Sequence, residues 1–103
     1  MKMIITKHET ADGLTVAIEG RVTAQNSNEL GDEVKSAISG TENLVFDFDK
    51  LEYISSSGLR VLLFAQKEMN KRGKMSIVNV SPEVYDVLKA IGFTGISDIF
   101  LKE

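Results

Sequence analysis

Short β-rich runs alternate with segments of helical periodicity along most of the chain, and this alternation constrains the fold more than any other feature. After residue 23, three helical patterns alternate with β-rich runs at Asn43–Phe48, Met75–Val80 and Ile99–Leu101. Strands that alternate with helices form parallel sheets through right-handed crossovers. The chain is therefore predicted to be an α/β protein with a mixed, mostly parallel sheet of four to five strands and three helices.

The first twenty residues depart from this alternation and predict an N-terminal β-hairpin. Met3–Thr6 and Leu14–Gly20 are rich in β-forming residues, and the second of them alternates apolar with small or polar side chains. The polar segment between them ends in Asp12-Gly13, which is a strong signal for a tight turn. The hairpin is expected to place an antiparallel strand at one edge of the sheet.

The helical patterns carry their own start and stop signals. The first follows the polar run Thr23–Glu29, with Asn26 or Ser27 as its expected cap, and Gly40 closes it. The second covers Leu59–Arg72 and ends in basic residues followed by glycine. With the third pattern, described next, three helices are therefore expected.

The third helical pattern starts at Ser81 and Pro82, a serine cap with proline at the first helical position, and Gly92 ends it. Apolar residues at helical spacing mark one face of each pattern, and in the second pattern this face is expected to be buried. These residues are Leu30, Val34, Ala37 and Ile38, then Leu59, Leu62, Leu63 and Met69, then Val84, Val87, Leu88 and Ile91.

The composition of the chain excludes several classes of function. Its 103 residues suit a single domain, predicted over residues 1–103, with one hydrophobic core. The chain has no cysteine, and His8 is its one histidine, so we expect no disulfide, no thiolate nucleophile, no metal site and no cofactor. A net charge of -3 argues against binding to nucleic acid or to anionic membranes.

No segment of the sequence predicts secretion or insertion into a membrane. The apolar stretch within the first six residues is too short for a signal-peptide core, and it meets a charge at Lys7. Nowhere do about 18 apolar residues run together, as a membrane-spanning helix requires. We therefore expect a cytoplasmic protein.

The run Ser55-Ser56-Ser57-Gly58, called the serine loop below, precedes the second helical pattern and is the main candidate for function. One serine is enough to cap a helix, which stabilises it by about 1 kcal/mol relative to alanine. A hydrolase nucleophile would need a histidine base and differently spaced glycines, and a phosphate-binding loop would need lysine and more glycines. A third use is a hydroxyl that a kinase modifies, because a helix N-terminus favours a phosphate.

Two further pairs of residues are candidates for support or binding. Asp47 and Asp49 share a face of a predicted strand and could pass for a metal or acceptor pair, but we expect Asp47 to anchor a loop by hydrogen bonds and Asp49 to begin a turn. Arg60 and Phe64 share a face of the second helix. Phe64 either packs under a neighbouring helix or is exposed as an anchor for a partner, with Arg60 as its polar companion beside the serine loop.

Residues 43–92 resemble the STAS domain family, in particular the bacterial anti-sigma factor antagonists. The resemblance rests on LVFDFDKLEYISSSGLRVLLFAQKEMNKRG and KMSIVNVSPEVYDVLKAIGF, and it extends through Gly20-Arg21-Val22 to nearly the whole chain. It implies a STAS-like single domain with no enzymatic activity of its own. It also implies that the partner is an anti-sigma factor with a histidine-kinase-like ATPase fold, bound through the serine loop and the following helix.

The resemblance further implies a phosphorylation switch. The family's acceptor is the residue before the glycine of the loop, which is Ser57 here, with Ser56 as the alternative. Its phosphorylation by the partner would release the antagonist, and a serine phosphatase would restore binding. Asp47 matches the aspartate that ends the preceding strand, and Ser55 and Thr23 stand where the family pattern often has acidic residues.

Two other functions remain as alternatives at this point. Related domains regulate membrane transporters of lipids and sulfate, so the chain could be an unphosphorylated adaptor subunit of such a complex, with serines that only cap a helix. The other alternative is a small serine hydrolase, for which His8 would have to supply the base.

Overall fold

The computed structural model describes residues 2–103, and its strands form a six-stranded sheet with the order β1-β2-β3-β5-β6. β4 pairs with the end of β2, beyond the part of β2 that pairs with β3. All pairs are parallel except β1 with β2, which confirms the predicted mixed, mostly parallel sheet. The strands are β1 (Ile4–Glu9), β2 (Leu14–Val22), β3 (Asn43–Asp47), β4 (Leu51–Ile54), β5 (Lys74–Val80) and β6 (Asp98–Leu101).

β4 is the strand that raises the number above the predicted four to five. Only its end residues Leu51 and Ile54 are buried, so it lacks the alternation by which strands are recognised in a sequence. Its position depends on pairing with a distant segment. The Gly20 N–H donates to the Lys50 carbonyl over 2.9 Å, and the Ser55 N–H donates to the Val22 carbonyl over 2.8 Å.

The predicted N-terminal hairpin is present, and its first strand runs three residues further than expected, to Glu9. The turn is held by a hydrogen bond of 2.8 Å from the Thr10 N–H to the Gly13 carbonyl. A Cβ on Gly13 would lie 2.0 Å from the Asn43 carbonyl oxygen. Glycine is therefore required there because the hairpin turn closely approaches the start of β3.

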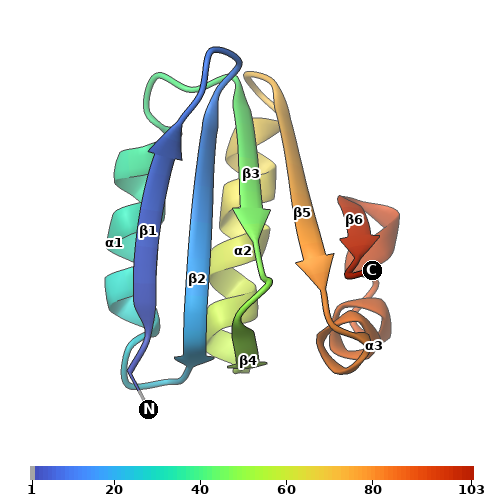
Figure 1. The fold of residues 1–103 in the computed structure, drawn as a ribbon. Helices are drawn as coiled ribbons and strands as arrows, with labels where there is room; N and C mark the ends of the chain where they lie inside the picture. The colour runs from blue at the N-terminus through green and yellow to red at the C-terminus, as the bar shows by residue number, and fades with distance from the viewer. Residues whose placement is uncertain (1) are drawn as a thin grey trace.

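Three α-helices and one short 3-10 helix accompany the sheet. Figure 1 shows α1 and α2 side by side against the same face of the sheet, with α3 near the end of β5. None of the helices in residues 2–103 is both long and apolar enough to cross a membrane. The helices are α1 (Ser27–Ile38), α2 (Ser56–Met69), α3 (Pro82–Ala90) and the 3-10 helix η1 (Phe93–Gly95).

The core lies between the sheet and the pair α1 and α2. Leu59, Leu62 and Met69 of α2 are buried as predicted, but the prediction for Leu63 is wrong, because its side chain is 36% exposed. In α3 only Val84 and Leu88 are buried. Val87 and Ile91 share their helical spacing but are exposed, because α3 presents only a narrow stripe to the core.

Candidate functional site

The serine loop forms the entry to α2, which begins at Ser56 rather than at the predicted Leu59. Ser55 is the N-cap in an extended conformation, and its Oγ accepts a hydrogen bond of 3.3 Å from the Gly58 N–H. The Leu59 N–H donates to the Ser55 carbonyl over 2.9 Å. One serine therefore accounts for the capping of α2.

Ser57 differs from its two neighbours in its surroundings. Its Oγ lies 3.0 Å from the Ser55 Oγ, so the two hydroxyls share a hydrogen bond. Ser57 is half-buried and lines a groove, whereas Ser56 is exposed and lies outside that groove. The first N–H groups of a helix have no acceptor within the helix, and they favour an anion near the first turn.

Gly58 seats the start of α2 against the sheet. A Cβ at this position would lie 2.6 Å from Val22 Cγ1 and 2.8 Å from Ile54 Cγ1. Both distances are too short for carbon atoms in contact, so a larger side chain would force Val22 and Ile54, or α2 itself, to shift. The glycine that ends the serine loop thus fixes the position of the hydroxyls before it.

An open groove of about 630 Å³ lies on the surface between α1 and α2, and it is called the α1–α2 groove below. Phe64 lies on its α2 side with 38% of the residue exposed, so it is not packed under a neighbouring helix. The Lys35 ammonium of α1 lies 5.7 Å from the centroid of the Phe64 ring. The lining residues are Ser27, Asn28, Gly31, Asp32 and Lys35 of α1 and Ser57, Arg60, Val61 and Phe64 of α2.

The groove brings together the site residues of α2 and adds an α1 wall that the sequence analysis missed. Ser57, Arg60 and Phe64 all line it, at intervals of three and four residues that place them on one side of the helix. The α1 wall has no motif of its own. Only the sheet topology could have predicted it. β2 and β4 are parallel neighbours, and the loops after parallel strands meet at one edge of a sheet, so the helices that follow these strands start close together.

Asn26, one of the two residues expected to cap α1, is its N-cap residue, and its side chain holds the loop between β2 and α1. The Asn26 Oδ1 accepts from the Thr23 N–H over 2.8 Å, and its Nδ2 donates to the Arg21 carbonyl over 2.9 Å. The side chain of Asn26 makes no capping hydrogen bond to α1. The Arg21 guanidinium lies 4.4 Å from the centroid of the Tyr53 ring, which links the end of β2 to β4 beside the serine loop.

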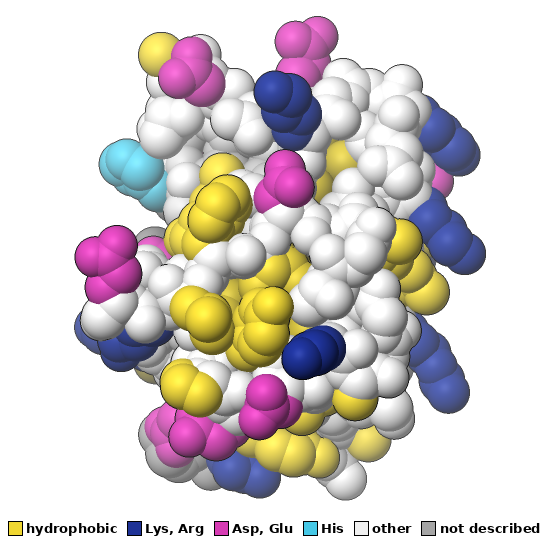
Figure 2. Space-filling model, turned by 90° about the vertical axis from the view of Figure 1, so that its right-hand side faces the viewer, with side chains coloured by type: hydrophobic (Ala, Val, Ile, Leu, Met, Phe, Trp, Pro, Cys, Tyr) yellow, Lys and Arg dark blue, Asp and Glu magenta, His cyan; other side chains and the backbone are white. Residues whose placement is uncertain are grey.

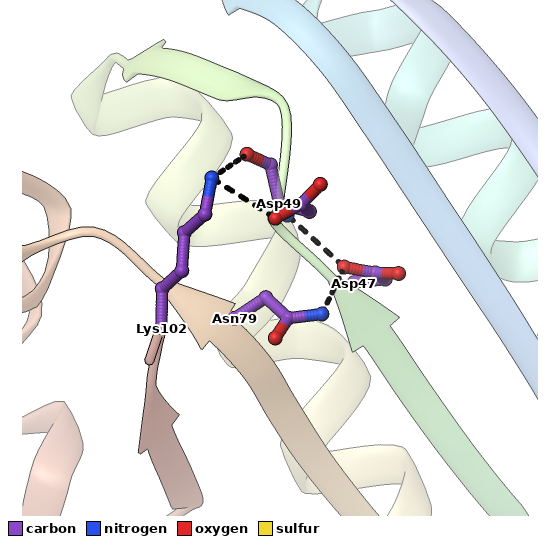
Figure 3. A network of polar contacts seen from close by, with 4 residues as sticks. All are labelled: Asp47, Asp49, Asn79 and Lys102. Atoms are coloured by element: carbon purple, nitrogen blue, oxygen red, sulfur yellow. Dashed lines mark hydrogen bonds and ion pairs between the residues drawn. The ribbon is translucent and has the colours of Figure 1, made fainter.

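Asp47 anchors its own turn, as the close-up in Figure 3 shows. Its Oδ1 accepts from the Asp49 N–H and from the Asn79 Nδ2, both over 3.0 Å. The Lys102 Nζ lies 3.0 Å from the Asp49 Oδ1 and donates to the Asp49 carbonyl over 3.2 Å. This network ties the turn after β3 to the ends of β5 and β6, and none of its hydrogen bonds reaches the serine loop.

His8 is too far from the serine loop to act on it. His8 pairs with Thr15 of β2, whereas Ile54, just before the serine loop, pairs with Val22 of β2. The seven residue steps from Thr15 to Val22 span about 23 Å along a strand. This separation removes the base that a serine hydrolase would need, and residues 2–103 contain no group of three or more side chains that could hold a metal ion.

Comparison with known proteins identifies one family over nearly the whole chain. The STAS domain family model matches residues 2–103. A candidate anti-sigma factor antagonist of Bordetella bronchiseptica, BtrV, is 32% identical over 99 residues, which cover 93% of this chain and 83% of that protein.

Solved structures share the fold at low sequence identity. An anti-sigma factor antagonist from Mycobacterium paratuberculosis superposes with a TM-score of 0.89 at 15% identity, covering 96% of this chain and 86% of that one. The Bacillus cell fate determinant SpoIIAA in its phosphorylated form superposes with a TM-score of 0.74 at 17% identity, covering 93% and 90%. These likenesses establish the fold that carries the serine loop and the α1–α2 groove.

Proposed function

This chain belongs to the STAS domain family, and we propose that it acts as an anti-sigma factor antagonist whose docking is controlled by phosphorylation of Ser57. The observation that carries the proposal is the position of Ser57 on the wall of the α1–α2 groove, together with Arg60 and Phe64. The names of its relatives support the antagonist role. The partner is an anti-sigma factor with a histidine-kinase-like ATPase fold, and the antagonist itself has no catalytic activity.

The unmodified protein docks through the serine loop and the α1–α2 groove. Phe64 supplies an exposed aromatic side chain, and aromatic residues are enriched at protein interfaces. Arg60 and Lys35 add positive charge to a groove whose only acidic residue is Asp32. A partner segment with an apolar side chain and an acidic neighbour would suit this surface.

Phosphorylation changes the charge at one point on this surface. A phosphate at Ser57 adds about -1.5 to -2 charges. The first turn of α2 tolerates this anion because its N–H groups and the helix dipole favour negative charge. Docking then requires the partner to desolvate a dianion, so the modified protein is released until a serine phosphatase restores the hydroxyl. The fold need not change, since only the groove surface is altered.

The test is phosphorylation of the purified chain by a purified anti-sigma factor kinase with ATP, followed by mapping of the phosphate by mass spectrometry. We expect one phosphate, on Ser57. Ser57→Ala should abolish its incorporation, and Ser56→Ala should leave it intact. A phosphate that maps to Ser56 would contradict the assignment of the acceptor, because Ser56 lies outside the groove.

The adaptor alternative predicts a different result in the same assay. A transporter subunit whose serines only cap α2 would take up no phosphate from any anti-sigma factor kinase and would bind none of them. We further propose that the chain acts in the cytoplasm, where such kinases meet their sigma factors. Binding of the unmodified chain to a kinase, lost on phosphorylation, distinguishes the two functions directly.

A further inference from the structure

We propose that β6 is a self-association surface, at which a second copy of this chain pairs antiparallel with the first across a two-fold axis. β6 is the last strand of the sheet, and within residues 2–103 it pairs only with β5. An edge strand presents unpaired N–H and C=O groups that can template a further strand. This surface involves neither the serine loop nor the α1–α2 groove, so it is independent of the proposed function.

The direction of the backbone groups along β6 shows which of them are free. The Lys102 N–H donates to the Val80 carbonyl of β5 over 2.8 Å. Because the backbone groups of a strand alternate between its two edges, those of Asp98 and Phe100 also face β5. The N–H and C=O groups of Ile99 and Leu101 therefore face the free edge of the sheet.

The irregular pairing between β5 and β6 does not alter this alternation. The register shifts between Ile77 and Val80, where β5 has one residue more than the facing part of β6. The extra length is taken up in β5, where Asn79 adopts a positive φ of 57°. β6 itself runs without interruption from Asp98 to Leu101.

The sequence of β6 is self-complementary in an antiparallel pair centred on Phe100. In that register Asp98 of one copy lies opposite Lys102 of the other, and opposite charges at facing positions stabilise a strand pair. Ile99 lies opposite Leu101, and each such pair exchanges two backbone hydrogen bonds. Phe100 lies opposite its own copy as a non-hydrogen-bonded pair, in which side chains are closest.

The side chains needed for this contact are accessible. Asp98 is exposed, and the exposed fractions of Phe100 and Leu101 are 56% and 51%. The Lys102 side chain is 47% exposed and makes two contacts with Asp49. An ammonium group has three donors, so Lys102 can keep Asp49 and also bind a carboxylate of the second copy.

The surroundings of β6 extend the apolar surface. Figure 2 views the molecule from the side of β6 and α3, and hydrophobic side chains gather there with charged side chains around them. A contact of this kind, apolar at its centre and charged at its rim, is typical of protein interfaces. The exposed apolar residues of α3, of the segment after η1 and of β6 are Val87, Ile91, Ile96, Phe100 and Leu101.

The opposite edge of the sheet provides a contrast. β1 ends in the exposed residues Lys7, His8 and Glu9, and Lys7 forms an ion pair with Glu33 of α1. Charged and polar side chains along an edge strand discourage pairing with another chain. β6, by contrast, ends in three consecutive apolar residues, Ile99–Leu101. An isologous contact between two β6 strands closes as a dimer and does not propagate.

The test is sedimentation velocity of the purified chain between about 5 and 500 μM, the range in which a small interface of this kind should associate. We expect a dimer whose fraction rises with concentration. Asp98→Lys and Lys102→Asp each place like charges opposite one another in the homodimer, and each should weaken association at least tenfold. An equimolar mixture of the two variants restores both opposite-charge pairs and should recover the dimer.

Two controls tie the result to β6. Glu9→Lys reverses a charge on β1 and should associate like the unmodified chain. Raising the concentration should slow amide hydrogen exchange at Ile99 and Leu101 and leave that at Phe100 unchanged. A chain that stays monomeric at the highest concentration would overturn the proposal. So would an Asp98→Lys variant that dimerises normally, or a mixture that fails to recover the dimer while both variants keep the circular dichroism of the folded chain.

Discussion

The helices α2 and α3 begin in the same way and yet present different surfaces. Ser55 caps α2 through Gly58, and Ser81 caps α3 through Val84, each with a hydrogen bond of 3.3 Å from the N–H to the serine Oγ. The two residues after each cap differ in type. They are Ser56 and Ser57 in α2, and Pro82 and Glu83 in α3.

The difference shows what the second and third serines add. At the second position of the helix, α3 carries a permanent carboxylate in Glu83, whereas α2 carries the hydroxyl of Ser57. Both positions favour negative charge because of the helix dipole. The start of α3 therefore stabilises a helix, while the start of α2 is capped equally well and also presents the Ser57 hydroxyl to a groove.

The largest effect is expected from the third position, where α2 has Gly58 and α3 has Val84. Gly58→Val should lower the free energy of unfolding by about 3 kcal/mol, because the new side chain would collide with Val22 and Ile54. Urea denaturation measures the change. Gly31→Ala in α1 is the matched control, since its Cβ would meet Val61 Cγ2 at an ordinary 3.7 Å. It should raise stability by up to about 1 kcal/mol.

The next effect concerns binding rather than stability. Ser57→Asp should weaken binding to the anti-sigma factor at least tenfold, or about 1.4 kcal/mol. The same variant should change the free energy of unfolding by less than about 0.5 kcal/mol, because an acidic residue is favoured at this position. Isothermal titration calorimetry with the anti-sigma factor measures the change in binding. Glu83→Gln at the equivalent position of α3 should leave binding unchanged in the same titration. A Ser57→Asp variant that binds normally would contradict the switch.

Removing the caps should affect both helices equally. Ser55→Ala and Ser81→Ala should each lower the free energy of unfolding by about 1 kcal/mol, the usual cost of losing a serine cap. The two variants should differ in phosphorylation. Only Ser55→Ala removes the hydroxyl that shares a hydrogen bond with Ser57, so only this variant should change the rate of phosphate transfer. Equal rates in both variants would show that the contact between Ser55 and Ser57 has no role in the reaction.

The smallest effect is expected further along the groove. Phe64→Ala should weaken binding to the anti-sigma factor about threefold, or about 0.7 kcal/mol, with little change in stability because the ring is already partly exposed. Leu63→Ala is the neighbouring control, since Leu63 is similarly exposed but does not line the α1–α2 groove. Equal binding losses in the two variants would argue against the groove as the docking surface.

Local signals predicted much of the fold because their causes lie within a few residues. The Asp12-Gly13 turn, the serine and proline at the start of α3 and the helical spacing of Leu59, Leu62 and Met69 all act over short distances. Their outcomes agree with the structure in element type and order. α2 begins three residues before the predicted Leu59, because a run of serines resembles a loop locally, whereas the cap at Ser55 allows Ser56 to be helical.

Features that depend on distant partners were not predictable in this way. β4 exists because the end of β2 extends past β3 and offers backbone groups at Gly20 and Val22. The exposure of Phe64 depends on how closely α1 approaches α2, and no local pattern encodes that distance. The role of Asp47 likewise rests on Asn79, which lies 32 residues away in the chain.

The sequence by itself determined the order of the helices and of every strand except β4, the serine cap of α3 and the run of hydroxyls before Gly58, since each of these follows from the chemistry of neighbouring residues. Only the tertiary structure decided that Ser57 and not Ser56 lines a groove, that α1 supplies the other wall, and that β6 has a free edge. Burial and strand pairing are properties of segments brought together from across the chain. For that reason they appear only when the whole core is assembled.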